Sequence, residues 1–146
     1  MNRHLLFCAL LGSMTACQHN DDIQPNSSSL AGEVTGNYQT NFYIDPSLAA
    51  TPTDKMSSAE LKAESDSTVT LIYTRLYPSR EVKQVAHVGL IRQADAVQLR
   101  VADSSIGSFQ TDRIFTNNGM EKQGKVLRIA LKQGEQDPVY FTGHKK

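Results

Sequence analysis

Short segments of alternating apolar and polar residues, separated by brief turns, are the feature that most constrains this 146-residue chain. A period of two puts every second side chain on one face of an extended strand, as in strands with one buried face. The connections are too short for the crossovers that parallel strands need. We therefore predict an all-β domain of about eight antiparallel strands, forming a barrel or a sandwich. The expected strands lie near residues 34–44, 60–64, 68–74, 82–91, 97–101, 106–115, 126–132 and 139–142.

One segment, 57–64, has two interpretations. Ser57 and Glu60 have the spacing of a helix capping box. The following Ser-Asp-Ser sequence is a turn into a β-branched run, so residues 60–64 also fit the first arm of a hairpin. We favour the hairpin. Before this segment, residues 45–55 contain Pro46 and Pro52 and are expected to form a loop, and Asn117-Asn118-Gly119 is a strong turn signal.

The N-terminus has the parts of an export signal in the required order. Arg3 precedes an apolar run over 5–11, which is too short to span a bilayer, since that takes roughly 20 residues. Met14-Thr15-Ala16-Cys17 resembles the lipobox of bacterial lipoproteins, with Met14 where Leu is usual. The resemblance implies that residues 1–16 are a removed signal peptide and that Cys17 is the site of lipid attachment, carrying fatty acids such as palmitate. Stable anchoring needs more than one acyl chain.

The residues after Cys17 are expected to form a tether. Residues 17–30 are rich in polar side chains, including three consecutive serines, and cannot bury enough surface to offset the entropy of ordering. We expect the folded domain to comprise residues 31–146. In the lipoproteins that the motif resembles, Gln18 is compatible with passage to the outer membrane. Asp21 and Asp22 fit either a tether for surface display or an ordinary solvated linker, so a periplasmic and a surface-facing position both remain open.

A second resemblance concerns the domain itself. Gly36-Asn37-Tyr38 near its start, the regular hairpins and the ending over 140–146 resemble the small lipocalin-like, or calycin-like, β domains of many Gram-negative lipoproteins. Lipocalins have Trp where Tyr38 stands, and this chain has no Trp. The resemblance implies a barrel with an inward-facing apolar surface on every strand.

Charge and motifs exclude several functions. The chain has 15 basic and 15 acidic residues and no basic stripe, so nucleic acid is not an expected partner. No histidines have metal-ligand spacing, and no free cysteine remains, so neither a metal nor another cofactor is expected. His87 alone has the chemistry of a general base, but a lone strand histidine more often lies on a polar face. We find no catalytic constellation and expect a non-enzymatic protein.

Two functions remain open for the domain. A small barrel can enclose one apolar molecule, and Leu71, Leu127 and Ile129 are the candidate wall residues because each alternates with polar neighbours. Alternatively, the barrel is filled and serves as an accessory or interaction subunit of an envelope complex. A cavity of roughly 300 Å³ or more would favour the first function. Several arginines lie in or beside the expected strands, and they have two interpretations. They line a cavity or a surface that faces polysaccharide, or they simply lie on the solvated outer face: Arg75, Arg92, Arg100, Arg113 and Arg128.

Overall fold

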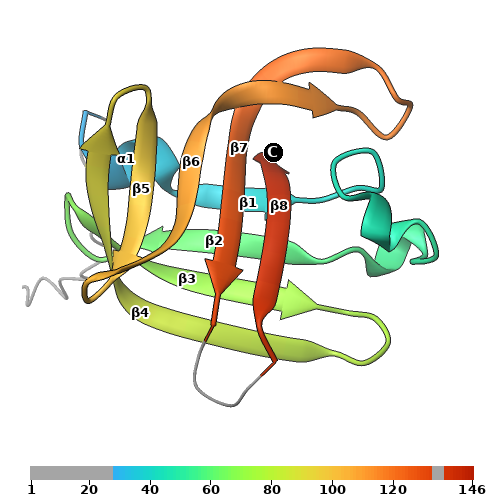
Figure 1. Ribbon diagram of the computed structural model, residues 1–146, viewed down its shortest axis with the longest axis horizontal. Coiled ribbons are helices and arrows are strands. Elements are labelled where there is room, and N and C mark those ends of the chain that lie inside the picture. The colour runs from blue at the N-terminus through green and yellow to red at the C-terminus, as the bar shows by residue number, and fades with distance from the viewer. Residues whose placement is uncertain (1–27, 133–136) are drawn as a thin grey trace, which may run out of the picture.

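The computed structural model describes residues 28–132 and 137–146, within which eight strands form one closed barrel (Figure 1). Each strand pairs antiparallel with its neighbours in sequence, and the last strand pairs with the first. The predicted all-β fold is confirmed, and of the two architectures left open the chain adopts the barrel. The strands are β1 (Gly36–Gln39), β2 (Ser58–Ala63), β3 (Thr68–Arg75), β4 (Glu81–Gln93), β5 (Ala96–Val101), β6 (Ser104–Phe115), β7 (Glu121–Leu131) and β8 (Val139–Lys145).

The period-two pattern accounts for most of these strands. In β3 the side chains of Val69, Leu71 and Tyr73 are buried, and the residues between them are partly exposed. Residues 58–63 form the strand β2, with Ala59 and Leu61 buried, so the hairpin interpretation of this segment is correct.

The pattern fails in β4 because that strand contains a bulge. Unbroken alternation over the strand expected at 82–91 would put Val82 and Val88 on one face, but Val88 is fully buried while Val82 is 51% exposed. Against β3 the register shifts near His87, which has a φ of 57°. The bulge adds one residue, so the alternation of inward and outward side chains shifts by one position across it. Val85, which precedes the bulge, is therefore buried, as is Val88, which follows it.

The start of the domain also differs from expectation. Residues 34–44 were interpreted as one strand, whereas Leu30–Val34 form a short helix, α1, and β1 covers only four residues. The Ser29 hydroxyl accepts a hydrogen bond from the Gly32 amide at 2.9 Å and so caps the helix. Ala31 is fully buried, and its amide donates to the Asp66 carbonyl at 3.0 Å. Helix α1 therefore covers one end of the barrel, next to the β2–β3 turn.

A long loop covers the other end of the barrel. Residues 40–57 include two short 3-10 helices, η1 (Pro46–Leu48) and η2 (Thr53–Lys55), and lie at the right of Figure 1, with α1 at the left. Asn41 begins this loop: its side-chain amide donates to the Phe115 carbonyl at 2.8 Å, and its Oδ1 accepts from the Tyr43 and Ile44 amides at 3.0 Å each. These bonds turn the chain out of β1 after four residues.

The barrel interior contains a single cluster of buried apolar side chains. Tyr38 packs edge-on against Phe109, with ring centroids 6.1 Å apart, and the Tyr38 hydroxyl donates to the Val34 carbonyl. Burial raises the pKa of the Tyr38 phenol well above its ordinary value. Tyr73 and Phe141 form a second edge-on pair at 6.0 Å near the loop-covered end.

The proposed signal peptide over residues 1–16, Cys17, and most of the tether over 17–30 lie outside the described residues. In the part of the chain that is described, no helix has the length and apolar character required to cross a bilayer.

Candidate functional site

The three side chains predicted to form a ligand wall lie inside the barrel. Leu71 is 1% exposed, Leu127 is fully buried and Ile129 is 3% exposed, and all three belong to the apolar core cluster. None of them lines the pockets described below. The described residues offer two other places for a site, one at each end of the barrel.

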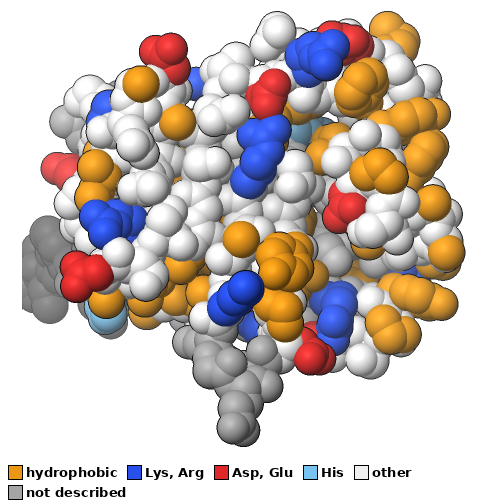
Figure 2. Space-filling model, in the orientation of Figure 1, with side chains coloured by type: hydrophobic (Ala, Val, Ile, Leu, Met, Phe, Trp, Pro, Cys, Tyr) orange, Lys and Arg blue, Asp and Glu red, His pale blue; other side chains and the backbone are white. Residues whose placement is uncertain are grey.

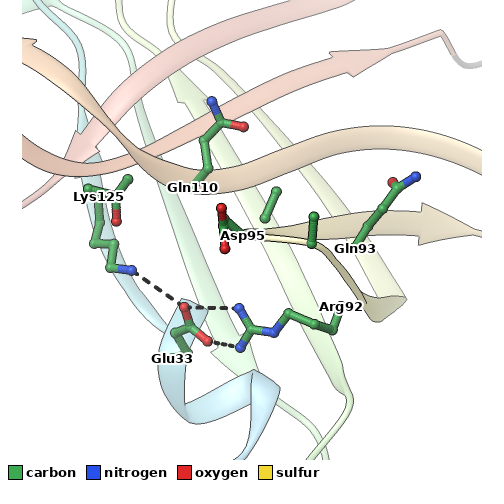
Figure 3. A pocket seen from close by; sticks show the side chains of 9 residues that line it. Glu33, Arg92, Gln93, Asp95, Gln110 and Lys125 are labelled. Atoms are coloured by element: carbon green, nitrogen blue, oxygen red, sulfur yellow. Dashed lines mark hydrogen bonds and ion pairs between the residues drawn. The ribbon is translucent and has the colours of Figure 1, made fainter.

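The first is a polar groove of about 890 Å³ beside α1, between the β4–β5 turn and strands β6 and β7 (Figure 3). Figure 3 shows the Glu33 carboxylate of α1 pointing at Arg92 of β4 and toward Lys125 of β7. Both Arg92 guanidinium nitrogens Nη1 and Nη2 donate to this carboxylate, and Lys125 Nζ lies 3.5 Å from it. Asp95 and Gln110 face the same space.

Three charged side chains of this groove pair with one another: Glu33, Arg92 and Lys125. Hydrogen bonding from Arg92 lowers the pKa of the Glu33 carboxyl and raises the pKa of Arg92 itself. Lys125 also lies 5.4 Å from the centroid of the Phe109 ring, and Lys145 Nζ donates to the Glu33 carbonyl at 3.0 Å. These contacts hold α1 against the barrel. We call Glu33, Arg92, Lys125 and Lys145 the clasp, and we interpret it as structural.

The second place is the mouth of the barrel, under the 40–57 loop. We define the mouth by the residues that line its pocket of about 150 Å³: Thr40, Asp45, Ser47, Leu48, Thr51, Lys55, Ser57, Tyr73, Arg75, Tyr77, Tyr140 and Phe141. Thr40 is 3% exposed, and Ser57 and Tyr73 are 8% exposed. The Tyr73 hydroxyl donates to Ser57 Oγ at 3.3 Å. The mouth is therefore a polar layer immediately above the apolar core.

A second pocket of about 170 Å³ adjoins the first and shares Tyr73, Arg75 and Tyr140 with it. Between the pockets, the Arg75 guanidinium donates through Nη2 to Glu81, which also lies 3.3 Å from Lys83 Nζ. Together the pockets come to roughly 300 Å³, the lower end of the range for ligand sites.

Two polar atoms of the mouth are buried without a hydrogen-bond partner among the described residues. They are Thr40 Oγ1 and Arg75 Nε. Since nearly all buried polar groups in folded proteins are hydrogen-bonded, such atoms call for an explanation. The clasp at the other end of the barrel contains no such atom in the residues described there.

Exposed apolar side chains gather around the mouth. Figure 2 shows hydrophobic side chains at the right-hand end of the molecule, over the 40–57 loop and the neighbouring turns. The exposed members are Phe42, Tyr43, Tyr77, Met120 and Tyr140, with Tyr140 61% exposed. Phe42 stacks on Tyr43, which in turn lies near Phe115.

The strand arginines lie mainly on the outer surface. Each has an acidic or carbonyl partner: Arg75 with Glu81, Arg92 with Glu33, Arg100 with the Asp103 carbonyl, Arg113 with Glu121 and Arg128 with Asp112. These arginines therefore face solvent, except Arg75, which lines the mouth.

His87 is on the polar outer face. Its side chain is 89% exposed, and its Nδ1 lies 2.8 Å from a Glu64 carboxylate oxygen. Hydrogen bonding from the His87 amide is the main cause that lowers the pKa of Glu64. Over residues 28–132 and 137–146 no three side chains are grouped as metal ligands would be.

Sequence reasoning did not single out the mouth. Thr40, Arg75 and Tyr140 are distant in sequence: Thr40 begins the loop after β1, Arg75 ends β3 and Tyr140 lies in β8. The proline-containing loop over 45–55 and the position of Arg75 at a strand end were the only signals in the sequence that pointed to this end of the barrel.

In comparisons with known proteins, no family model, no curated protein and no solved structure matches this chain. Its class is therefore defined by the fold, which is a closed eight-stranded antiparallel barrel in sequence order, compatible with a lipocalin-like domain.

Proposed function

We propose that this protein is a lipid-anchored envelope lipoprotein whose barrel is a non-enzymatic accessory module that acts through its outer surface and mouth. The observation that carries this proposal is the filled interior. Tyr38, Phe109, Leu61 and Leu127 belong to the buried apolar cluster of the barrel, and each is at most 1% exposed. Close-packed interiors of this kind leave no room for a carried apolar molecule.

The exposed aromatic side chains around the mouth support the same role. Tyr and Phe are enriched where protein surfaces meet partners, because each offers a large rigid contact area. Helix α1, which follows the tether, lies at the opposite end of the barrel (Figure 1). The mouth would then point away from the anchor and remain accessible.

The filled interior can be tested at the three side chains that the sequence nominated as a ligand wall. Leu71→Ala, Leu127→Ala and Ile129→Ala should each lower the free energy of unfolding by about 2–5 kcal/mol, measured with urea. Protein purified gently from its host should carry no apolar molecule in native mass spectrometry. A co-purifying lipid that these variants lose, with small changes in stability, would instead support the apolar-carrier function.

The anchor requires a separate test. Cys17→Ser should abolish fatty-acid labelling in a Gram-negative host and release the protein from the outer-membrane fraction. Arg3 and the apolar run are unchanged in this variant, so export itself should continue. Protease treatment of intact cells would then distinguish a periplasmic from a surface-facing position. Unchanged labelling and membrane retention would refute the lipoprotein assignment.

A further inference from the structure

One edge of strand β8 lacks a partner strand over most of its length. The first strand, β1, pairs with β8 only at His144 and Lys145, whereas β7 pairs with it from Val139 to His144. Residues 139–143 of β8 therefore have β7 on one side and no paired strand on the other. An edge of this kind presents backbone N–H and C=O groups to which another extended chain can bond.

The register shows which residues of β8 present their backbone groups at this edge. The Lys146 amide donates to the Asn37 carbonyl at 3.0 Å, so the backbone of residue 146 faces β1. In antiparallel pairing alternate residues face the same neighbour, and the β7–β8 pairing continues without a shift. Tyr140 and Thr142 therefore turn their N–H and C=O groups toward the free edge. In the part of the chain that is described, no backbone hydrogen bond joins either of them to the 40–57 loop.

Asn41 is the reason why β1 does not cover this edge. If β1 continued in register, Asn41 would lie opposite Thr142. The Asn41 carbonyl instead accepts hydrogen bonds from the Ile44 and Asp45 amides, at 3.1 and 2.9 Å. Both lone pairs of this oxygen are then in use, so it cannot also accept from the Thr142 amide. The bonds that end β1 thus leave the edge of β8 open.

Both pockets of the mouth lie along this edge. Tyr140 lines both of them, and the second follows β8 back through residues 137–139. Their opposite wall includes Arg75 of β3 and, in the second pocket, Lys83 of β4. Lys83 Nζ also donates to the Asp137 carbonyl at 2.9 Å, which joins the two walls just before β8 begins. The free edge is therefore one side of a groove.

The groove has room for one extended segment. The pockets measure about 150 and 170 Å³, and each holds about five waters at the volume a water occupies in the liquid, which is space for one side chain. In an extended segment alternate side chains point to the same face. The two side chains that flank the residue opposite Tyr140 would then enter the pockets, whose floor contains Tyr73 and Phe141. The residue opposite Tyr140 would remain outside, beside the tyrosine ring, which is 61% exposed.

The charges of the groove favour an uncharged segment. The Arg75 guanidinium is already paired with Glu81, and Lys83 lies 3.3 Å from the same carboxylate. Such a balance gives no net field that would select a charged side chain. Over the two pockets three acidic side chains balance three basic ones: Asp45, Glu81 and Asp137 against Lys55, Arg75 and Lys83.

The surroundings of the edge favour another protein over the other occupants. Walls lie on both sides of the groove, so only a single strand without a neighbour can enter it. In a second copy of this chain β8 is paired with β7 and does not meet this condition. Helix α1 lies at the opposite end of the barrel (Figure 1). Residues 17–27, which precede it, contain Asp21, Asp22 and Pro25, whose charges and missing amide do not suit this edge.

We propose that the free edge of β8 binds an extended, uncharged segment of a partner protein. The segment pairs antiparallel with β8, in line with β1. Main-chain hydrogen bonds to Tyr140 and Thr142 hold it, and the two pockets receive its inward side chains. This inference rests on the proposed interaction role and names the chemistry of the partner, but it depends neither on the lipid anchor nor on the identity of that partner.

The probe is the capped peptide acetyl-Thr-Val-Thr-Val-Thr-Val-amide, which is uncharged and has a high β-propensity. Its control is the same peptide N-methylated at every residue, which cannot donate main-chain hydrogen bonds. Binding to the full-length protein in mild detergent is followed by amide chemical shifts in NMR. The unmodified peptide should shift the Tyr140 and Thr142 amides, and the methylated peptide should not bind.

Hydrogen exchange of the free protein tests the edge without any substitution. The amides of Tyr140 and Thr142 should exchange faster than those of Phe141 and Gly143, which face β7. Addition of the peptide should slow the exchange of the first pair and leave the second pair unchanged. This measurement decides the proposal even where a variant fails to fold.

The decisive variant is Tyr140→Pro, which removes one edge amide. Proline is tolerated in an edge strand where its missing N–H would face outward. The variant should bind the peptide about tenfold more weakly, as expected for one lost hydrogen bond. Tyr140→Phe keeps the amide and the ring and is the matched control, which should bind normally. Urea unfolding of both variants shows whether the barrel remains folded.

Four results would overturn the proposal. Absence of peptide binding at about 1 mM is the first, and slow exchange of the Tyr140 and Thr142 amides in the free protein is the second. A dimer that Tyr140→Pro dissociates would assign the edge to a second copy. Peptide binding that appears only after deletion of residues 18–27 would assign it to the chain's own N-terminal segment. None of these results involves the filled interior or Cys17, so the proposed function fails or stands separately.

Discussion

Single atoms decide how closely the strands of this barrel approach one another, and Gly107 is the clearest case. It lies opposite Ile129 where β6 pairs with β7. A Cβ at this position would lie 2.2 Å from the Arg128 carbonyl oxygen, which is backbone and cannot move aside alone. Gly89 of β4 is different, since a Cβ there would meet only the Arg100 carbonyl oxygen, at an ordinary 3.8 Å.

Gly107→Ala should therefore lower the free energy of unfolding by about 1–3 kcal/mol, because the strands must separate locally to admit the methyl group. The measurement is urea unfolding followed by circular dichroism. Gly89→Ala is the control and should remain within about 0.5 kcal/mol of the wild type, since it adds a methyl group without overlap. Equal losses in both variants would mean that overlap with the Arg128 carbonyl is not the cause of the loss at Gly107.

At the scale of elements, the clasp explains how a helix of five residues persists. So short a helix is unstable alone, and its stability must come from tertiary contacts. Ala31 and Val34 are buried, and the Glu33 carboxylate joins α1 to β4 through Arg92 and to β7 through Lys125. The Glu33 side chain is 27% exposed, so solvent screens these pairs only in part.

This clasp should make stability depend on pH. Arg92 lowers the pKa of Glu33 below its ordinary value of 4.5, so the folded protein binds fewer protons there than the unfolded chain does. The contribution is thus complete above the unfolded pKa and is lost as the pH falls through the lower folded pKa. Glu33→Gln should cost about 0.5–1.5 kcal/mol at neutral pH, and its difference from the wild type should shrink in acid.

Thermal unfolding of both proteins between neutral and acidic pH checks this expectation. Glu121→Gln removes a more exposed ion pair, with Arg113, and is the matched control. It should change stability by less than about 0.5 kcal/mol. A Glu33→Gln difference that is the same at every pH would show that the ion pairs do not stabilise α1.

For the whole molecule, the important event is closure between the first strand and the last. The β1–β8 pairing is short, with Tyr38 opposite Lys145 and Gln39 opposite His144. By contrast, β6 and β7 pair continuously from Gly107 to Phe115. The barrel should therefore have one weak seam, located where β1 meets β8.

Amide hydrogen exchange should detect this seam. Amides of β8 that face β1 should exchange through a partial opening with a lower free energy than global unfolding, and those of β6 and β7 only through global unfolding. The two regions are compared in one sample by mass spectrometry or NMR, at several low urea concentrations. Uniform protection around the barrel would mean that closure is as strong as the longest hairpin.

The sequence alone determined the strands and their direction. Alternation in residues 68–74 predicted that Leu71 faces inward, and short turns such as that at Gly119 excluded parallel pairing, because both are local properties of the chain. Local pattern also gave its own errors. It extended the first strand through Asn41, where side-chain bonds to the backbone turn the chain away, and it misplaced Val82, where one additional residue in β4 reverses the faces.

Tertiary structure alone decided closure, the docking of α1 and the mouth. Whether Leu71, Leu127 and Ile129 enclose a cavity or a filled core depends on the combined volume of side chains from all strands, which no single segment specifies. The mouth brings together the loop between β1 and β2, which contains Thr40, the end of β3 at Arg75, and β8, which contains Tyr140. These residues meet only because the barrel closes. The buried, unpaired atoms Thr40 Oγ1 and Arg75 Nε exist only in the folded chain, because water hydrates these groups in the unfolded chain.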